Sequence, residues 1–187
     1  MGDRRSVIAF AAAAAVVAWV VGTAVADGHK QQQRRHRERA HRKEQPESAV
    51  PAVDNPTYEE VCGACHFPLQ PALLPSRSWQ LLLAGTQDHF GQSVGLEAEQ
   101  LAEVEAYLTG NAAEHTSGEL AQEIVNSVGS STPLRVTDVP VIRGEHRRLD
   151  HAVFQSASVA GRADCPACHP GATTGVYDDD SVTIPSR

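Results

Sequence analysis

The chain has 187 residues and a mass of 20.0 kDa, which is enough for one small domain. Aromatic residues make up only 5% of it, and fifteen consecutive apolar residues stand together at 7–21, so little material is left for a hydrophobic core. From residue 48 onward the chain has seven basic and eighteen acidic residues and no basic stripe, which excludes nucleic-acid binding for this part. A core this poor in aromatic residues needs another source of cohesion.

Residues 1–26 have the pattern of a secretory signal peptide. Arg4 and Arg5 precede the apolar run, and Ala24-Val25-Ala26 has the small-x-small form of a signal peptidase site. Cleavage after Ala26 predicts export to the periplasm. The apolar run is shorter than the ~20 residues of a typical membrane span, but an uncleaved segment would act as an N-terminal membrane anchor.

Residues 27–53 are predicted to form a flexible basic linker. Between residues 29 and 47 there are seven basic and three acidic residues and almost no large apolar ones. Such a composition cannot bury enough surface to offset the entropy of ordering. Its positive charge suits peripheral contact with acidic lipid headgroups. The folded domain is expected at 54–187.

Two copies of one motif contain every cysteine of the chain. Residues 62–66 read Cys-Gly-Ala-Cys-His and residues 165–169 read Cys-Pro-Ala-Cys-His. C-x-x-C-H is the attachment signature of c-type haem, in which both thiols bond one porphyrin edge and the histidine binds the iron. The expected attachment residues are Cys62, Cys65, Cys165 and Cys168, and the expected axial ligands are His66 and His169. The cofactors predicted are two covalently attached haem c groups.

Other uses of the cysteines explain the pattern less well. Two disulfides would suit an exported protein but would not account for a histidine after each pair. The two pairs stand about 100 residues apart, unlike the compact spacing of zinc ribbons. A redox-active Cys-x-x-Cys would need a thioredoxin-like strand and helix, which the pattern does not predict.

The second axial ligand of each iron is expected to be histidine. The one methionine, Met1, leaves with the signal peptide, so His/Met ligation is excluded in the mature protein. His89 precedes Phe90-Gly91, where glycine allows close approach to a porphyrin. His146 lies among arginines, of which Arg143 and Arg147 are expected to bind haem propionates. His115 and His151 are expected to have surface or supporting roles. The sequence leaves open which distal histidine serves which iron.

The periodicity predicts a mainly α fold with long irregular loops. Residues 96–108 have leucine and valine at helical spacing, and Gly110 is the expected stop. A helix capped by Thr57 is expected to lead into the first motif, and a helix capped by Asp164 to carry the second. Residues 130–148, interrupted by prolines, are expected to be an extended loop. Trp79 is expected to pack in the core or against a haem.

Several further segments follow the first motif in a characteristic order. These are Leu74–Trp79, His89–Gly91, Tyr107–Ala113, Arg143–His146 and the second motif with Pro170–Ala172. With them the chain resembles, over residues 58–185, the bacterial dihaem cytochrome c family, whose members accompany small oxygen-binding haem proteins and membrane cytochromes b. The resemblance implies a helical dihaem cytochrome c fold wrapped around two bis-histidine haems, with His89 and His146 as distal ligands. The chain departs from it at Leu82-Leu83-Ala84, where similar sequences tend to have a methionine.

The expected function is electron transfer and not enzymatic catalysis. With both axial positions filled, no substrate bonds to iron, and two imidazoles per iron predict lower potentials than His/Met ligation. The resemblance implies redox partners such as a small c-type haem protein and a membrane cytochrome b. The alternative is a haem enzyme or gas-binding protein with one five-coordinate haem. A structural haem subunit of a membrane complex, held through the basic linker, is a third interpretation.

Overall fold

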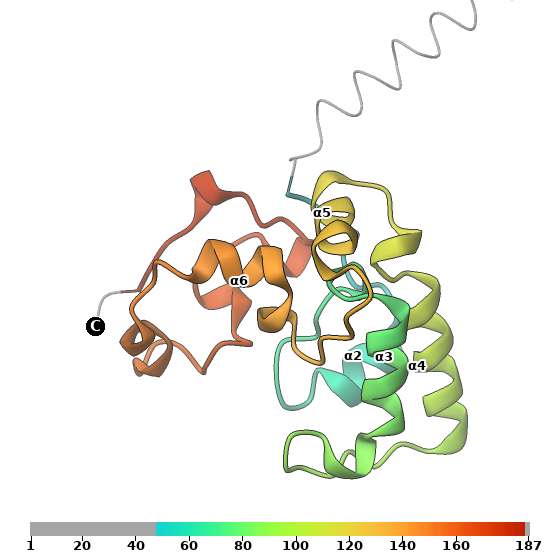
Figure 1. Cartoon of the computed structure of the whole chain (residues 1–187). Coiled ribbons are helices and arrows are strands. Elements are labelled where there is room, and N and C mark those ends of the chain that lie inside the picture. The colour runs from blue at the N-terminus through green and yellow to red at the C-terminus, as the bar shows by residue number, and fades with distance from the viewer. Residues whose placement is uncertain (1–47, 186–187) are drawn as a thin grey trace, which may run out of the picture. The chain divides into compact units, whose positions relative to one another are not determined.

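The computed structural model describes residues 48–185, which belong to a unit spanning Pro46–Arg187 (Figure 1). The predicted signal peptide and most of the predicted linker lie outside the described residues. Between residues 48 and 185 the structure is mainly helical and has isolated β-bridges but no extended strand, which confirms the predicted fold class. The α-helices are α2 (Pro56–Cys62), α3 (Ser76–Ala84), α4 (Ala98–Gly110), α5 (Glu119–Val128) and α6 (Pro140–His146). In this same range, no helix is both long and apolar enough to cross a membrane.

The hydrophobic core lies between α3, α4 and α5. Helices α3 and α4 run side by side (Figure 1), and α5 supplies Ile124 to the same core. Trp79 of α3 is buried, and its indole N–H donates a hydrogen bond of 2.8 Å to the carbonyl oxygen of Pro71. Val104 and Leu108 of α4 are fully buried. This core positions the loops at both ends of α3, where the first site lies.

Two predicted helix starts are borne out to different degrees. Helix α4 begins after Glu97, whose side chain and that of Gln100 form a reciprocal capping box. The predicted cap of the first helix is wrong by two residues, because Asn55 and not Thr57 caps α2. The Asn55 side-chain oxygen accepts a 2.7 Å hydrogen bond from the Tyr58 N–H, and Pro56 occupies the first helical position.

The prediction of an extended loop over residues 130–148 is wrong. A 3₁₀ turn at Val136–Asp138 leads into helix α6, which begins at Pro140. Proline is tolerated at a first helical position because the N–H it lacks would have no partner inside the helix. The helix matters for the site because its last turn carries His146.

The predicted boundary between linker and domain at residue 54 lies too far along the chain. Val50 is buried, and its N–H donates to the carbonyl oxygen of Gly175 at 2.9 Å. The N–H of Tyr177 donates to Ser48 at 3.1 Å, so residues 48–50 pair with the chain that follows the second motif. Gly175 has φ +77°, and a Cβ there would lie 2.0 Å from the Val50 oxygen. The linker is predicted from a polar composition, and that polar composition stops before these apolar residues begin.

Candidate functional site

The first motif follows the end of α2. Cys62 is the last residue of this helix, and the Gly63 N–H caps it by donating to Glu59. Burial raises the pKa of the Cys62 thiol to about 11, whereas Cys65 is exposed. The His66 ring is also exposed, and its Nδ1 lies 2.8 Å from the carbonyl oxygen of Phe67. A carbonyl only accepts hydrogen bonds, so Nδ1 is the protonated nitrogen and Nε2 is free to bind a metal.

The second motif forms a 3₁₀ turn over Cys165–Ala167, so the predicted α-helix is wrong. Asp164 does not cap this turn through its side chain. Its carboxylate instead accepts a hydrogen bond of 3.0 Å from the Ala160 N–H, in the preceding loop. The turn still holds His169 close to the start of the motif, since the His169 N–H donates a hydrogen bond of 2.8 Å to the carbonyl oxygen of Cys165. Burial raises the pKa of the Cys165 thiol to about 11.

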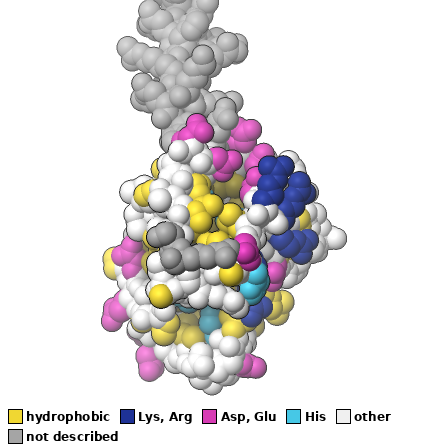
Figure 2. All heavy atoms as spheres, turned by 90° about the vertical axis from the view of Figure 1, so that its left-hand side faces the viewer, with side chains coloured by type: hydrophobic (Ala, Val, Ile, Leu, Met, Phe, Trp, Pro, Cys, Tyr) yellow, Lys and Arg dark blue, Asp and Glu magenta, His cyan; other side chains and the backbone are white. Residues whose placement is uncertain are grey.

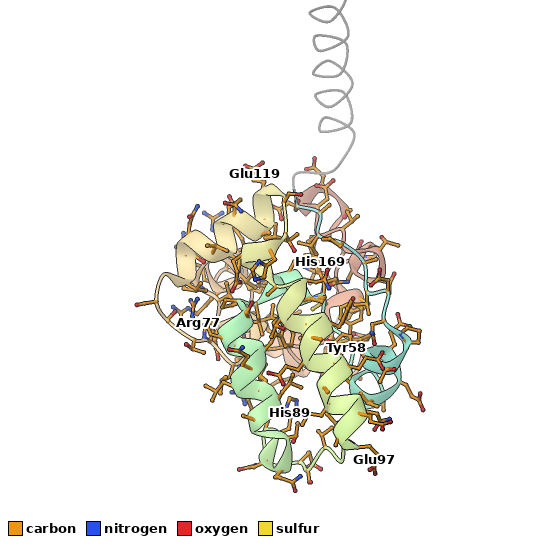
Figure 3. All side chains as sticks on the ribbon, turned by 90° about the vertical axis from the view of Figure 1, so that its right-hand side faces the viewer. Tyr58, Arg77, His89, Glu97, Glu119 and His169 are labelled. Atoms are coloured by element: carbon orange, nitrogen blue, oxygen red, sulfur yellow. The ribbon has the colours of Figure 1, made fainter. Side chains whose placement is uncertain are left out.

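His66 faces His89 across a short distance. Their ring centres are 6.3 Å apart and their planes differ by 18°. His89 follows α3 (Figure 3) in a tight turn, in which its backbone exchanges hydrogen bonds with Gln92 at 2.7 and 3.2 Å. Phe90 and Gly91 adopt φ values of +55° and +89° in this turn. The strained turn directs the His89 ring toward the first motif.

His146 and His169 form a second pair. Their ring centres are 5.9 Å apart and their planes differ by 57°. The Nδ1 of His146 lies 2.8 Å from the Ile142 carbonyl oxygen, which is one helical turn earlier in α6. This contact protonates Nδ1 and leaves Nε2 free, as in His66.

The surroundings favour a neutral imidazole at one member of each pair, His89 and His169. Burial lowers the pKa of His89, and the charges of His66 and Arg135 lower it further. Burial and the charge of His146 lower the pKa of His169, against an opposing effect of Asp179. A neutral imidazole is the form that binds a metal.

The spacing of the two pairs fits one metal ion between each pair of rings. A metal–imidazole nitrogen bond measures about 2.0–2.1 Å and the ring centre lies about 1 Å beyond the nitrogen, so opposed imidazoles have centres about 6 Å apart. Both observed separations agree with this value. Each pair also has the two thiols of one motif beside it, which is the donor set that a c-type haem needs. The chain therefore has the residues to hold two haems.

The sequence-predicted arginines line a cavity of about 360 Å³ beside His146. Around it lie Thr137, Asp138, Arg143, His146, Arg147, Leu149, Phe154 and Arg162. Arginine side chains gather at the edge of this face, next to exposed hydrophobic groups (Figure 2). Sequence reasoning missed Arg162, whose guanidinium lies 4.4 Å from the centre of the Phe154 ring. Its place three residues before the second motif is the only sequence signal for it.

The other predicted residues lie apart from the imidazole pairs. Trp79 is a core residue of α3 that bonds to Pro71, as described above. His115 and His151 are exposed in short 3₁₀ turns. Sequence reasoning also missed Tyr177, whose ring centre lies 5.5 Å from that of His169, and Gln70, which bonds to Tyr177. Neither belongs to a motif.

Comparison with known proteins agrees with this arrangement. The family model for dihaem cytochrome c matches residues 58–177. A dihaem cytochrome c from Rhodobacter sphaeroides is 32% identical, with a TM-score of 0.59, over 68% of this chain and all of that one. A structure from Shewanella baltica, also a dihaem cytochrome c, is 28% identical with a TM-score of 0.57, over 71% of this chain and 94% of that one. No curated protein matches the chain.

The matched region includes both motifs and all four paired histidines. Both solved structures are described as dihaem cytochromes, and the chain spans nearly the whole of each. The cofactors of the chain are therefore two haem c groups, one for each C-x-x-C-H motif. With this fold and these two motifs, the chain belongs to the dihaem cytochrome c family.

Proposed function

We propose that the chain is an exported electron carrier whose two haems are each held between two histidines. Its family serves haem-based electron transfer and not, in general, enzymatic catalysis. The observation that carries the finer proposal is the pairing of His66 with His89 and of His146 with His169 at ring separations of 6.3 and 5.9 Å. These separations suit an iron ligated on both faces.

The side chains have distinct roles in this scheme. The Nδ1 contacts of His66 and His146 fix the tautomer, so that Nε2 of each ring is the ligand atom. The haem iron supplies a one-electron ferric/ferrous couple. The pairs His66 with His89 and His146 with His169 would hold the two irons and keep substrates from them. Histidine in place of methionine stabilises the ferric state, so low midpoint potentials are expected at both haems.

The arginine-lined cavity is proposed to hold the propionates of the second haem. Arg143 and Arg147 project from the end of α6, and Arg162 approaches from the segment before the second motif. Guanidinium groups bind carboxylates through two parallel hydrogen bonds. The two propionates would offset two of the three positive charges that line the cavity.

The proposed partners follow from charge and from the N-terminal pattern. From residue 48 onward the chain has a large excess of acidic side chains, which favours a partner with a basic docking face and salt-sensitive association. A signal-peptide pattern at residues 1–26 supports a periplasmic location. The proposed partners are a small c-type haem protein and a membrane cytochrome b.

The visible spectrum of the dithionite-reduced holoprotein before and after carbon monoxide tests the ligation scheme. Both haems are expected to stay low-spin and unchanged, since carbon monoxide finds no open axial position. His89→Ala and His146→Ala should each open one haem, about half of the total, to carbon monoxide. The matched control His115→Ala replaces an exposed histidine and should behave as wild type. A shift of half the haem in the wild-type protein would instead favour a ligand-binding function.

A further inference from the structure

We propose that Tyr177 positions His169 at the second haem and is itself held by Gln70, which belongs to the segment after the first motif. The inference rests on the proposed bis-histidine ligation. It assigns a role to two residues outside the motifs and links the two haem sites through a buried hydrogen bond.

His169 differs from the other ligands in how its ring is held. His66 and His146 each direct Nδ1 at a backbone carbonyl oxygen at 2.8 Å. The Nδ1 of His169 is buried and has no hydrogen-bond partner among residues 48–185. An axial histidine usually donates its second ring N–H to a partner that fixes the orientation of the ring. Another contact must therefore set the orientation of His169.

Tyr177 provides this contact. Its ring meets that of His169 edge to face, with ring centres 5.5 Å apart and planes at 63°. The His169 ring also neighbours the partner ligand His146, with ring centres 5.9 Å apart. Edge-to-face packing of aromatic rings restricts the rotation of both rings. The tyrosine ring thus restricts rotation of the His169 imidazole.

Gln70 holds Tyr177 in place. It is fully buried, and its Oε1 accepts a hydrogen bond from the Tyr177 hydroxyl. Its Nε2 donates a hydrogen bond of 2.6 Å to the carbonyl oxygen of Ala172, three residues after His169. The amide of Gln70 therefore binds the segment that follows the second motif at two residues, Ala172 and Tyr177. Losing either bond would leave a buried polar group without a partner.

The same segment is anchored to the first motif. Leu69, the neighbour of Gln70, accepts a hydrogen bond of 2.8 Å from the Tyr58 hydroxyl. Tyr58 is the buried residue of α2, the helix that ends at Cys62. A continuous set of contacts therefore runs from the helix of the first motif to the axial ligand of the second haem.

The test uses holoprotein variants at position 177 and low-spin ferric EPR spectra. Tyr177→Phe keeps the ring and loses the bond to Gln70, and Tyr177→Leu loses the ring as well. The signal of the second haem, identified as the one lost in His146→Ala, should shift in the first variant. In the second variant we expect loss of its sharp low-spin form and carbon monoxide binding to about half the haem. The signal of the first haem should stay unchanged.

Tyr107→Phe is the matched control. Its hydroxyl accepts a hydrogen bond of 3.2 Å from the Asp54 N–H, away from the second pair. This variant should leave both signals as in wild type. Unchanged second-haem signals in both variants at position 177 would overturn the inference and leave the ligation scheme standing. Carbon monoxide binding by the wild-type protein would overturn the ligation scheme, and the inference with it.

Discussion

At the scale of single residues, a charged side chain lies near one histidine of each pair. The guanidinium of Arg135 stands 3.8 Å from the centre of the Phe90 ring, and its charge lowers the pKa of the adjacent His89. The carboxylate of Asp179 acts in the opposite direction on His169. Ferric haem has one more positive charge than ferrous haem. A nearby cation therefore raises a midpoint potential and a nearby anion lowers it.

Arg135→Gln is expected to lower the midpoint potential of the first haem. Exposed charge pairs are worth about 0.2–1 kcal/mol, which for a one-electron couple is about 10–40 mV. A spectroscopic redox titration of the holoprotein measures the shift. Arg148→Gln removes an equal charge from another exposed position and should leave the first haem unchanged. An upward shift in Arg135→Gln would show that the guanidinium does not act on the iron as a charge.

Asp179→Asn is expected to raise the midpoint potential of the second haem by a similar amount, about 10–40 mV. The carboxylate stabilises positive charge on the His169 imidazole and hence on the ferric iron bound to it. The same titration reports the shift, which should diminish as salt is added. Asp180→Asn, at the next and exposed position, is the control. Equal shifts in both variants would point to net charge and not to the position of Asp179.

At the scale of elements, local signals predict structure where the sequence holds them next to each other. Helix α4 could be predicted because its apolar spacing and its capping residues Glu97 and Gln100 lie within one segment. Helix α6 could not, since it is short, and Pro140 looks like a break until its place at the first helical position is known. The second motif forms a 3₁₀ turn. The Asp164 carboxylate accepts a hydrogen bond from the N–H of Ala160 and does not cap the motif.

The candidate site also contains some residues that the local sequence predicts and others that only the fold brings together. The cysteines and motif histidines are recognisable from spacing alone, and histidine is the expected distal ligand because the sequence has no methionine besides Met1. The pairing of these histidines needs the fold, since it depends on where α6 and the turn at His89 lie. Gln70 and Tyr177 are 107 residues apart and have no local pattern, so no sequence signal could have joined them.

The pairing of residues 48–50 with the C-terminal segment gives a prediction about stability. Gly175→Ala would place a Cβ 2.0 Å from the Val50 carbonyl oxygen at a φ of +77°. We expect a loss of about 1–3 kcal/mol in the free energy of unfolding. Chemical denaturation of the holoprotein measures it. Gly110→Ala, at the end of α4 where a Cβ meets nothing within 4 Å, should be neutral or stabilising. Equal stability of the two variants would contradict the pairing.

At the scale of the whole molecule, hydrophobic burial is concentrated in the first part of the described chain. Residues 50–139 contribute every buried member of the main core cluster, against which Val141, Ile142 and Tyr177 pack while partly exposed. In the described residues after 139, the only buried hydrophobic side chains are Val153, Val159 and Ala172. This second part has one short α-helix and several 3₁₀ turns. Covalently held haem is a large apolar group, and here it would take the place of a side-chain core.

Loss of the second haem should therefore unfold one part of the molecule and not the other. In a Cys165→Ser, Cys168→Ser double variant, amide hydrogen exchange is expected to become fast after residue 139. Helices α3, α4 and α5 should keep most of their protection, because their core does not include the second site. The matched variant Cys62→Ser, Cys65→Ser removes the attachment residues of the first haem. It should loosen α2, which ends at Cys62, and the end of α3, which precedes His89, while the later segment would stay protected by its own haem. Uniform loss of protection in the first variant would mean that the two parts fold as a single cooperative unit, with the buried contacts of Gln70 strong enough to couple them.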